Sequence, residues 1–190
     1  QTLTVNSVAG NVIFTGAIGA TTSLGGLSVN PSAGDGDITF TSTIGDSGNA
    51  GVVGTTAIGN TSTADLNFDS TIYSFDGATT ITAAAGDNID INSAVSFTTA
   101  ADNISFATGN IALADGSNLT IDTGAGAGNI TIGAEIAGTS VETVTLDAGT
   151  GTTSVGVIGS GTEIGALSIG SAENGGITLN GAIVTDGAVT

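Results

Sequence analysis

The stretch Asp37-Ile38-Thr39-Phe40-Thr41-Ser42-Thr43-Ile44-Gly45 decides the fold, because related segments recur along the chain. Each copy begins with Asn, Asp or Gly, continues as apolar–x–apolar, and has another apolar residue seven positions after its first residue. The copies begin at Asn11, Asp37, Asp65, Asn88, Asn103, Asn129 and Gly176, and the copy at Asn103 is one residue longer before its last apolar residue. Alternation with a period of two is typical of half-buried strands, and the Gly, Asn and Asp clusters between copies are typical of turns. The sequence therefore predicts an all-β protein.

The spacing of the copies indicates how these strands are arranged. The first four copies begin 26, 28 and 23 residues apart, and segment 17–29 aligns with segment 157–169. Units of this size cannot bury their own apolar face, so they stack on their neighbours. We predict one domain, residues 1–190, that forms a parallel β-solenoid of about seven or eight coils. The alternative is a β-sandwich, such as a pilin-like subunit, because strands every 8–12 residues also fit that architecture.

Stacked coils place equivalent side chains in ladders. The two ladders predicted inside the core are Phe14, Phe40 and Phe68, and Ile18, Ile44 and Ile72. The Asn or Asp that heads a copy is expected at a turn, where its side chain bonds nearby backbone amides. Tyr73 and Phe75 interrupt the pattern; they are expected to cover the edge of the core, and an outward-facing aromatic contact is the alternative.

Composition excludes several classes of function. The chain has no Lys, Arg, His or Cys, against 17 Asp and Glu, and its net charge is −17. Nucleic acid and anionic membranes are excluded as partners, because phosphate contacts require Lys or Arg. No apolar run reaches the roughly 18 residues of a membrane helix, so no membrane insertion is expected. Catalytic triads, Schiff bases and zinc sites need residues that are absent, and no catalytic residue is assigned.

Carboxylates leave two chemical possibilities. One is a carboxylate-based glycosidase, a remote alternative whose close pairs are Asp35 with Asp37 and Asp87 with Asp90. The other is calcium, which binds carboxylate and carbonyl oxygens. The candidate calcium ligands are Asp35, Asp37, Asp87, Asp90, Asp65 and Asp69. Neither an EF-hand nor a calcium β-roll motif is present. We therefore expect solvated turn residues with weak, diffuse calcium binding, and no required cofactor.

The outward residues of the copies bear on a different surface function. They are Ile13, Thr39, Asn67, Asp90, Ser105, Thr131 and Thr178. A mixed, partly charged set of this kind is a poor template for ice, which requires a regular register along the face. The sequence therefore disfavours ice binding.

Segment 36–45 (Gly-Asp-Ile-Thr-Phe-Thr-Ser-Thr-Ile-Gly) and segment 167–172 (Leu-Ser-Ile-Gly-Ser-Ala) carry a family resemblance. They resemble repeat regions of giant bacterial surface proteins, namely filamentous-haemagglutinin-like and autotransporter-type β-strand repeat adhesins. The resemblance spans essentially the whole chain. It implies secretion to the bacterial cell surface and roles in adhesion, biofilm matrix or surface fibres. Those proteins usually carry some lysine, whereas this chain has none.

These observations predict a structural repeat module of an extracellular fibre or adhesin shaft. The chain lacks Met, and neither end resembles a polar cap, so it is expected to be a fragment or a polymerising unit. Its partners would be adjoining repeats or other copies of itself, stacked head to tail. The alternative is a module that binds a surface glycan or a host protein, through a groove of aromatic, Asn and Asp side chains around Tyr73.

Overall fold

The computed structural model describes residues 1–8, 10–29, 36–170 and 175–190. Within these ranges the secondary structure consists of strands and turns, and all the strand pairs are parallel. The described chain therefore has no helix of the length and hydropathy that crossing a membrane requires.

The strands form three sheets, called A, B and C below. Sheet A contains β1 (Thr2–Val5), β3 (Gly26–Val29), β5 (Thr56–Gly59), β8 (Thr79–Thr82), β11 (Ile104–Phe106), β14 (Ile130–Ile132), β17 (Thr153–Val155) and β19 (Ile177–Leu179). Sheet B contains β2 (Val12–Phe14), β4 (Ile38–Phe40), β6 (Leu66–Phe68), β9 (Asn88–Ile91), β12 (Asn110–Leu113) and β15 (Ile136–Ala137). Sheet C contains β7 (Ile72–Ser74), β10 (Val95–Thr98), β13 (Leu119–Asp122), β16 (Thr143–Asp147) and β18 (Ala166–Ile169).

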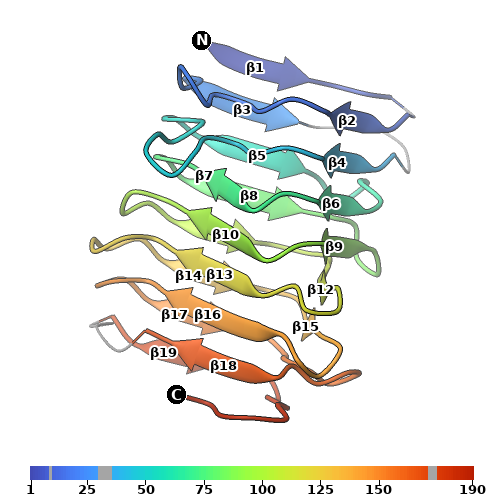
Figure 1. The fold of residues 1–190 in the computed structure, drawn as a ribbon, viewed down its shortest axis with the longest axis vertical. Helices are drawn as coiled ribbons and strands as arrows, with labels where there is room; N and C mark the ends of the chain where they lie inside the picture. The colour runs from blue at the N-terminus through green and yellow to red at the C-terminus, as the bar shows by residue number, and fades with distance from the viewer. Residues whose placement is uncertain (9, 30–35, 171–174) are drawn as a thin grey trace.

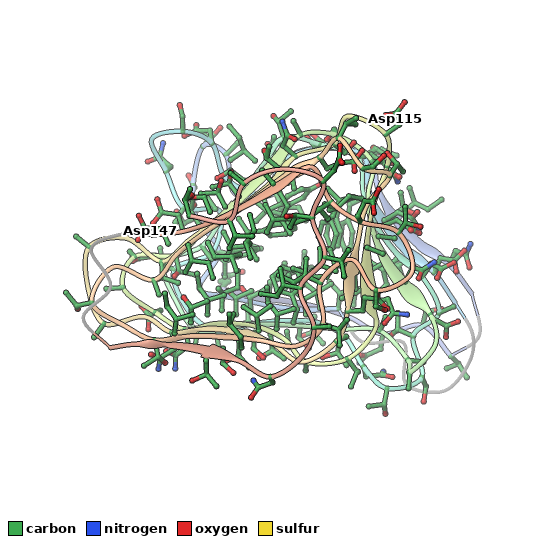
Figure 2. The ribbon with its side chains drawn as sticks, turned by 90° about the horizontal axis from the view of Figure 1, so that it is seen from below. Asp115 and Asp147 are labelled. Atoms are coloured by element: carbon green, nitrogen blue, oxygen red, sulfur yellow. The ribbon has the colours of Figure 1, made fainter. Side chains whose placement is uncertain are left out.

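From β5 to β16 the chain visits sheets A, B and C in turn and then starts the next coil. Before β5 and after β16 one side of each coil has no strand, and isolated bridges such as Ile18 with Ile44 and Ile158 with Ile183 take its place. The stacked coils form a three-sided parallel β-solenoid of about seven turns. Figure 1 shows the coils stacked along the long axis with the two termini at opposite ends. Figure 2 looks along this axis and shows side chains filling the space inside the three sides. The predicted solenoid is confirmed. The sandwich alternative is wrong, because its hairpins and Greek keys require antiparallel strands.

The repeated motif does not mark one face of the solenoid. The copies headed by Asn11, Asp37, Asp65 and Asn88 lead into sheet B, whereas those headed by Asn103, Asn129 and Gly176 lead into sheet A. A turn residue followed by apolar–x–apolar specifies a short strand with one buried face. All three sides need such strands, so the motif recurs at whichever corner the chain has reached.

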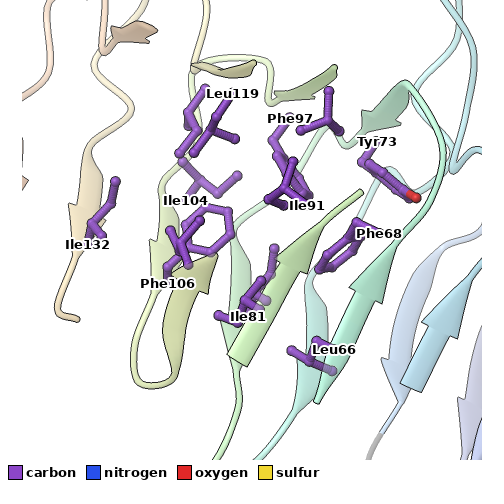
Figure 3. Packing of buried hydrophobic residues seen from close by; sticks show 14 of the residues in the cluster. Leu66, Phe68, Tyr73, Ile81, Ile91, Phe97, Ile104, Phe106, Leu119 and Ile132 are labelled. Atoms are coloured by element: carbon purple, nitrogen blue, oxygen red, sulfur yellow. The ribbon is translucent and has the colours of Figure 1, made fainter. Parts of the chain in front are cut away.

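The predicted phenylalanine ladder is confirmed in the core. The rings of Phe14 and Phe40 are stacked with centroids 4.9 Å apart, and those of Phe40 and Phe68 are stacked at 5.4 Å. Stacked and edge-on aromatic pairs contribute on the order of 1 kcal/mol each beyond the area that they bury. The next rung of this ladder is Ile91, which Figure 3 shows near Phe68 within the packed interior.

The predicted isoleucine ladder needs a correction at its third rung. Ile18 pairs with Ile44 as expected, but Ile44 pairs with Tyr73, and Ile72 is half-buried on the outside of β7. A shift of one residue exchanges the buried and exposed sets of a strand. The observed register buries Tyr73 and Phe75, which removes more apolar surface from water than burying Ile72 would.

The Ile-Gly step shared by the aligned segments 17–29 and 157–169 has a steric cause. Gly19 and Gly159 have φ angles of 68° and 69°, in the left-handed region where glycine has no steric penalty. A Cβ atom would lie 2.1 Å from the carbonyl oxygen of Gly51 at Gly19, and 2.3 Å from that of Val184 at Gly159. Both the positive φ angle and the lack of room for a Cβ atom therefore require glycine at these two corners.

Candidate functional site

The residue before each early strand of sheet B links one coil to the next. The backbone amide of Asp37 donates to Oδ1 of Asn11 at 3.1 Å, and the amide of Asp65 donates to Oδ1 of Asp37 at 3.4 Å. The amide of Asn88 donates in turn to Oδ1 of Asp65 at 2.9 Å. The expectation that these residues bond backbone amides is confirmed, and each amide belongs to the following coil.

Similar links occur on the other two sides. The amide of Asn129 donates to Oδ1 of Asn103 at 2.9 Å, and the amide of Thr152 donates to Oδ1 of Asn129 at 2.8 Å. At the start of sheet C, the amide of Thr143 donates to Oδ1 of Asn118 at 2.8 Å. Asn and Asp at these corners thus stabilise the stacking of coils, which accounts for their recurrence without any chemical role.

Four carboxylates lie on the outside of sheet B or at its corners. Asp37 and Asp65 precede β4 and β6, Asp69 follows β6, and Asp90 lies on β9 beside Asn67. Burial raises the pKa of the Asp90 carboxyl. The negative charges of Asp65, Asp37 and Asp69 raise this pKa further. The summed negative charge of these groups attracts cations to this side of the solenoid.

Five of the six candidate calcium ligands lie in the part of the chain that the structure describes. Asp35 lies outside the described residues. Asp37 and Asp69 each accept a side-chain amide, with Nδ2 of Asn11 at 3.0 Å and Nδ2 of Asn92 at 2.8 Å. Asp87 precedes β9 in a turn, where its amide donates to the carbonyl of Ala84 at 3.1 Å. Among the described residues, no three His, Cys, Asp or Glu side chains are grouped so that they could hold a metal ion.

The sequence gives no signal for one buried carboxylate, that of Glu142. The side chain of Glu142 has no exposed surface and lies in the loop between β15 and β16. Its Oε2 accepts the amide of Thr139 at 2.6 Å, and its Oε1 accepts the amide of Gly116 at 3.1 Å as well as the hydroxyl of Thr139. Within the same loop, Ser140 has a φ of 87°, which is uncommon for a residue other than glycine. Glu142 thus holds a strained corner and connects it to the preceding coil.

The electrostatics of Glu142 follow from these contacts. Burial by itself raises the pKa of this carboxyl. Hydrogen bonds from the Thr139 hydroxyl and from the amides of Thr139, Glu142 and Gly116 outweigh burial and lower the pKa to about 2. Glu135 has a similar, less buried role: its Oε1 accepts the amide and hydroxyl of Ser160 at 2.9 and 2.7 Å, and these bonds lower its pKa.

Tyr73 does not form the exposed groove that a ligand-binding module would need. Its ring is fully buried, stacked on Phe97 at 5.2 Å and edge-on to Phe68 at 4.8 Å. Its hydroxyl donates to the carbonyl of Phe40 and accepts the amide of Ser70, both at 3.1 Å. Burial raises the pKa of this phenol. The sequence predicts Tyr73 at the edge of the core, and it lies inside the core instead, so the alternative of an outward-facing aromatic contact is wrong. The described residues form no pocket.

The seven outward residues of the motif, which form a mixed set in the sequence, belong to two different sides of the solenoid, sheet B and sheet A. Ile13, Thr39, Asn67 and Asp90 form a mixed column on sheet B. The column along the middle of sheet A, called the hydroxyl column below, is far more uniform. It consists of Thr4, Ser28, Ala57, Thr80, Ser105, Thr131, Ser154 and Thr178. The premise of one irregular outer face is therefore wrong.

The ends of the solenoid expose residues that would be buried in its middle. In the last coil the exposed fractions are 49% for Ile177, 48% for Leu179 and 56% for Val189. Ile177 and Leu179 occupy the inward positions of β19, paired with the buried Thr153 and Val155 of β17. At the other end, the inward side chains of β1 are only partly buried. No described residue covers either end.

Comparison with known proteins adds no relative: no protein-family model, curated protein or solved structure matches this chain.

Proposed function

We propose that this chain is a structural repeat module, a segment of a stiff shaft whose coils are extended at both ends by further coils. The observation that carries the proposal is the exposure of Ile177 and Leu179 at inward positions of the last coil. Apolar surface of this kind is stabilised by removal from water. The open edges of β1 and β19 also present unpaired backbone groups, which pair readily with another strand.

The inward ladders of sheet A run from one end of the solenoid to the other, which supports head-to-tail stacking. Leu3 and Ile177 belong to one inward ladder of sheet A, and Val5 and Leu179 belong to the next. A second copy placed on the last coil would continue these ladders without a break. Such a contact joins two different surfaces and does not close, so it builds a filament.

The setting that we propose is a fibre or adhesin shaft on the surface of a bacterium, as the resemblance of the repeats suggests. The complete absence of cationic side chains supports a passive structural part over nucleic-acid or anionic-membrane binding. The proposal assigns no catalytic step. It gives divalent cations the role of counter-ions that screen the carboxylates.

Electron microscopy of the purified chain at neutral pH tests end-to-end stacking. We expect filaments whose axial repeat equals a whole number of coils. Leu179→Asp places a charge inside the proposed joint and should abolish the filaments, because an unpaired buried charge is strongly unfavourable. The matched control is Thr178→Asp, which adds the same charge on the outward side of β19 and should leave filaments intact. Dispersed short rods for the unmodified chain at high concentration would contradict the proposal.

A further inference from the structure

Among the described residues, the outer face of sheet A carries no charged side chain. Its central column is the hydroxyl column, and the outward positions on both sides of that column hold only Thr, Asn, Ala and Gly among the described residues. The other two sides differ. Sheet B carries Asp37, Asp65 and Asp90 at outward positions, and sheet C carries Asp122 and Asp147. The carboxylates are thus segregated away from one side of the solenoid.

This segregation matters because the molecule has no cation with which to neutralise a neighbour. Two copies with a net charge of −17 each repel one another wherever carboxylates face carboxylates. Placing charges in a contact without partners is strongly unfavourable. Contact through the outer face of sheet A avoids both penalties. Among the three sides, it is the one where two copies can approach closely without desolvating a carboxylate.

The side chains on this face also suit a second copy of the same face. Hydroxyl groups both donate and accept hydrogen bonds, so the hydroxyl column is complementary to itself. Thr4, Thr80 and Thr131 are exposed, while Ser28 and Ser105 are half-buried between their neighbours. No outward side chain in the described columns is longer than Asn, so two flat faces can approach at the spacing of stacked sheets, about 10 Å.

The area of the face indicates when such contact becomes stable. Eight strands spaced about 4.8 Å apart, with roughly 15 Å of strand width, present on the order of 500 Å². Stable interfaces bury about 800 Å² per partner, so two isolated copies would pair weakly. A filament repeats the face once per copy, and linked weak contacts then act together. We propose that the outer face of sheet A is a lateral contact, through which filaments of this chain pair with each other. This inference rests on the end-to-end stacking proposed above.

Charge variants test the lateral contact in filaments. Ser105→Asp with Thr131→Asp puts two carboxylates on adjacent rungs of the hydroxyl column. The matched control is Ser96→Asp with Thr120→Asp, which changes the same residue types on adjacent rungs of sheet C. By electron microscopy we expect paired or bundled filaments for the unmodified chain and the control, and single filaments for the sheet A variant. Bundling of the sheet A variant to the same extent as the control would overturn the inference.

Cross-linking separates this inference from the end-to-end proposal. The chain has no cysteine, so Ser105→Cys and Thr120→Cys each supply a single thiol, on sheet A and on sheet C. With a short bismaleimide at high protein concentration, we expect about tenfold more cross-linked dimer for Ser105→Cys than for Thr120→Cys, because pairing raises the effective concentration of the thiols. Equal yields would overturn the lateral contact even where filaments form. Excess dimer from Ser105→Cys without any filaments would uphold sheet A as the contact face between copies, but it would reject end-to-end stacking and with it the pairing of filaments.

Discussion

Individual polar residues matter in this molecule mainly as links between coils. Asn11, Asn103 and Asn118 each accept a backbone amide of the next coil, and Glu142 does so towards the preceding coil. The sequence predicts this role for Asn11 and Asn103, because Asn or Asp at the head of a strand is a common turn signal, whereas Asn118 lies outside the seven copies of the motif. The sequence does not predict Glu142, whose partner Gly116 is 26 residues away and becomes adjacent only after the coils stack.

Glu142 gives a prediction at the residue scale. Gln has the same shape, but an NH2 group replaces one of the two carboxylate oxygens. Either the amide of Thr139 or the amide of Gly116 then loses the oxygen that accepts its hydrogen bond. We expect Glu142→Gln to lower the free energy of unfolding at pH 7 by about 1–3 kcal/mol, since buried donors are left unsatisfied. The exposed Glu163 provides the control, and Glu163→Gln should change the free energy by less than about 0.5 kcal/mol. Urea unfolding of the three proteins measures both values.

The same substitution should change the dependence of stability on pH. The pKa of Glu142 falls from an ordinary 4.5 to about 2 in the folded chain. A depressed carboxyl pKa adds stability that is complete above the unfolded value and is lost as pH falls through the folded value. The contribution of Glu142 should therefore disappear between about pH 4.5 and pH 2. The difference in stability between the unmodified chain and Glu142→Gln should shrink over this window, and a constant difference would show that the charge of Glu142 is not responsible.

At the scale of single elements, short strands are held by ladders that cross from coil to coil. The period-two pattern was sufficient to predict the strands and the stack of Phe14, Phe40 and Phe68. The same pattern could not predict the side to which a strand belongs, because all three sides bury alternate residues. It also could not choose between Ile72 and Tyr73, since both are apolar and the choice depends on what the neighbouring coils leave to be filled.

The phenylalanine ladder gives a prediction for these elements. Phe40 lies in the middle of the stack and is fully buried, whereas Phe14 lies at its end and is only partly buried. Phe40→Ala should lower the free energy of unfolding by about 3–5 kcal/mol, because the cavity is closed on both sides. Phe14→Ala is the control at the open end and should have a clearly smaller effect. Thermal or urea unfolding of the two variants measures these effects. Equal losses of unfolding free energy would mean that the rings do not act as a continuous stack.

At the scale of the whole molecule, charge and shape act against each other. All charged side chains are acidic, and such self-repulsion destabilises a compact state. A solenoid spreads the carboxylates along its length, and in the part of the chain that the structure describes the strands of sheet A carry none. This distribution could not be read from the sequence, because it depends on the assignment of each strand to a side.

The charge leads to a prediction about cations. If binding is diffuse, Ca²⁺ and Mg²⁺ at equal concentration should raise the melting temperature by similar amounts, and NaCl at higher ionic strength should reproduce most of the gain. Calorimetry with each salt measures this, and Asp90→Asn, which removes a carboxylate close to Asp65, Asp37 and Asp69, should reduce the gain slightly. A much larger effect of Ca²⁺ than of Mg²⁺ would instead indicate a defined site with flexible, high-number oxygen coordination.

The direction of the hydrogen bonds between coils has a mechanical consequence. These bonds run along the long axis, and each coil is bonded only to the coils directly above and below it. A pull on the two termini therefore loads one terminal coil at a time, and each coil that detaches releases about 25 residues, or roughly 80 Å of extended chain. Under tension a stack of such coils should therefore lengthen in small steps and dissipate work at each step, so that the load falls gradually instead of being lost in a single rupture.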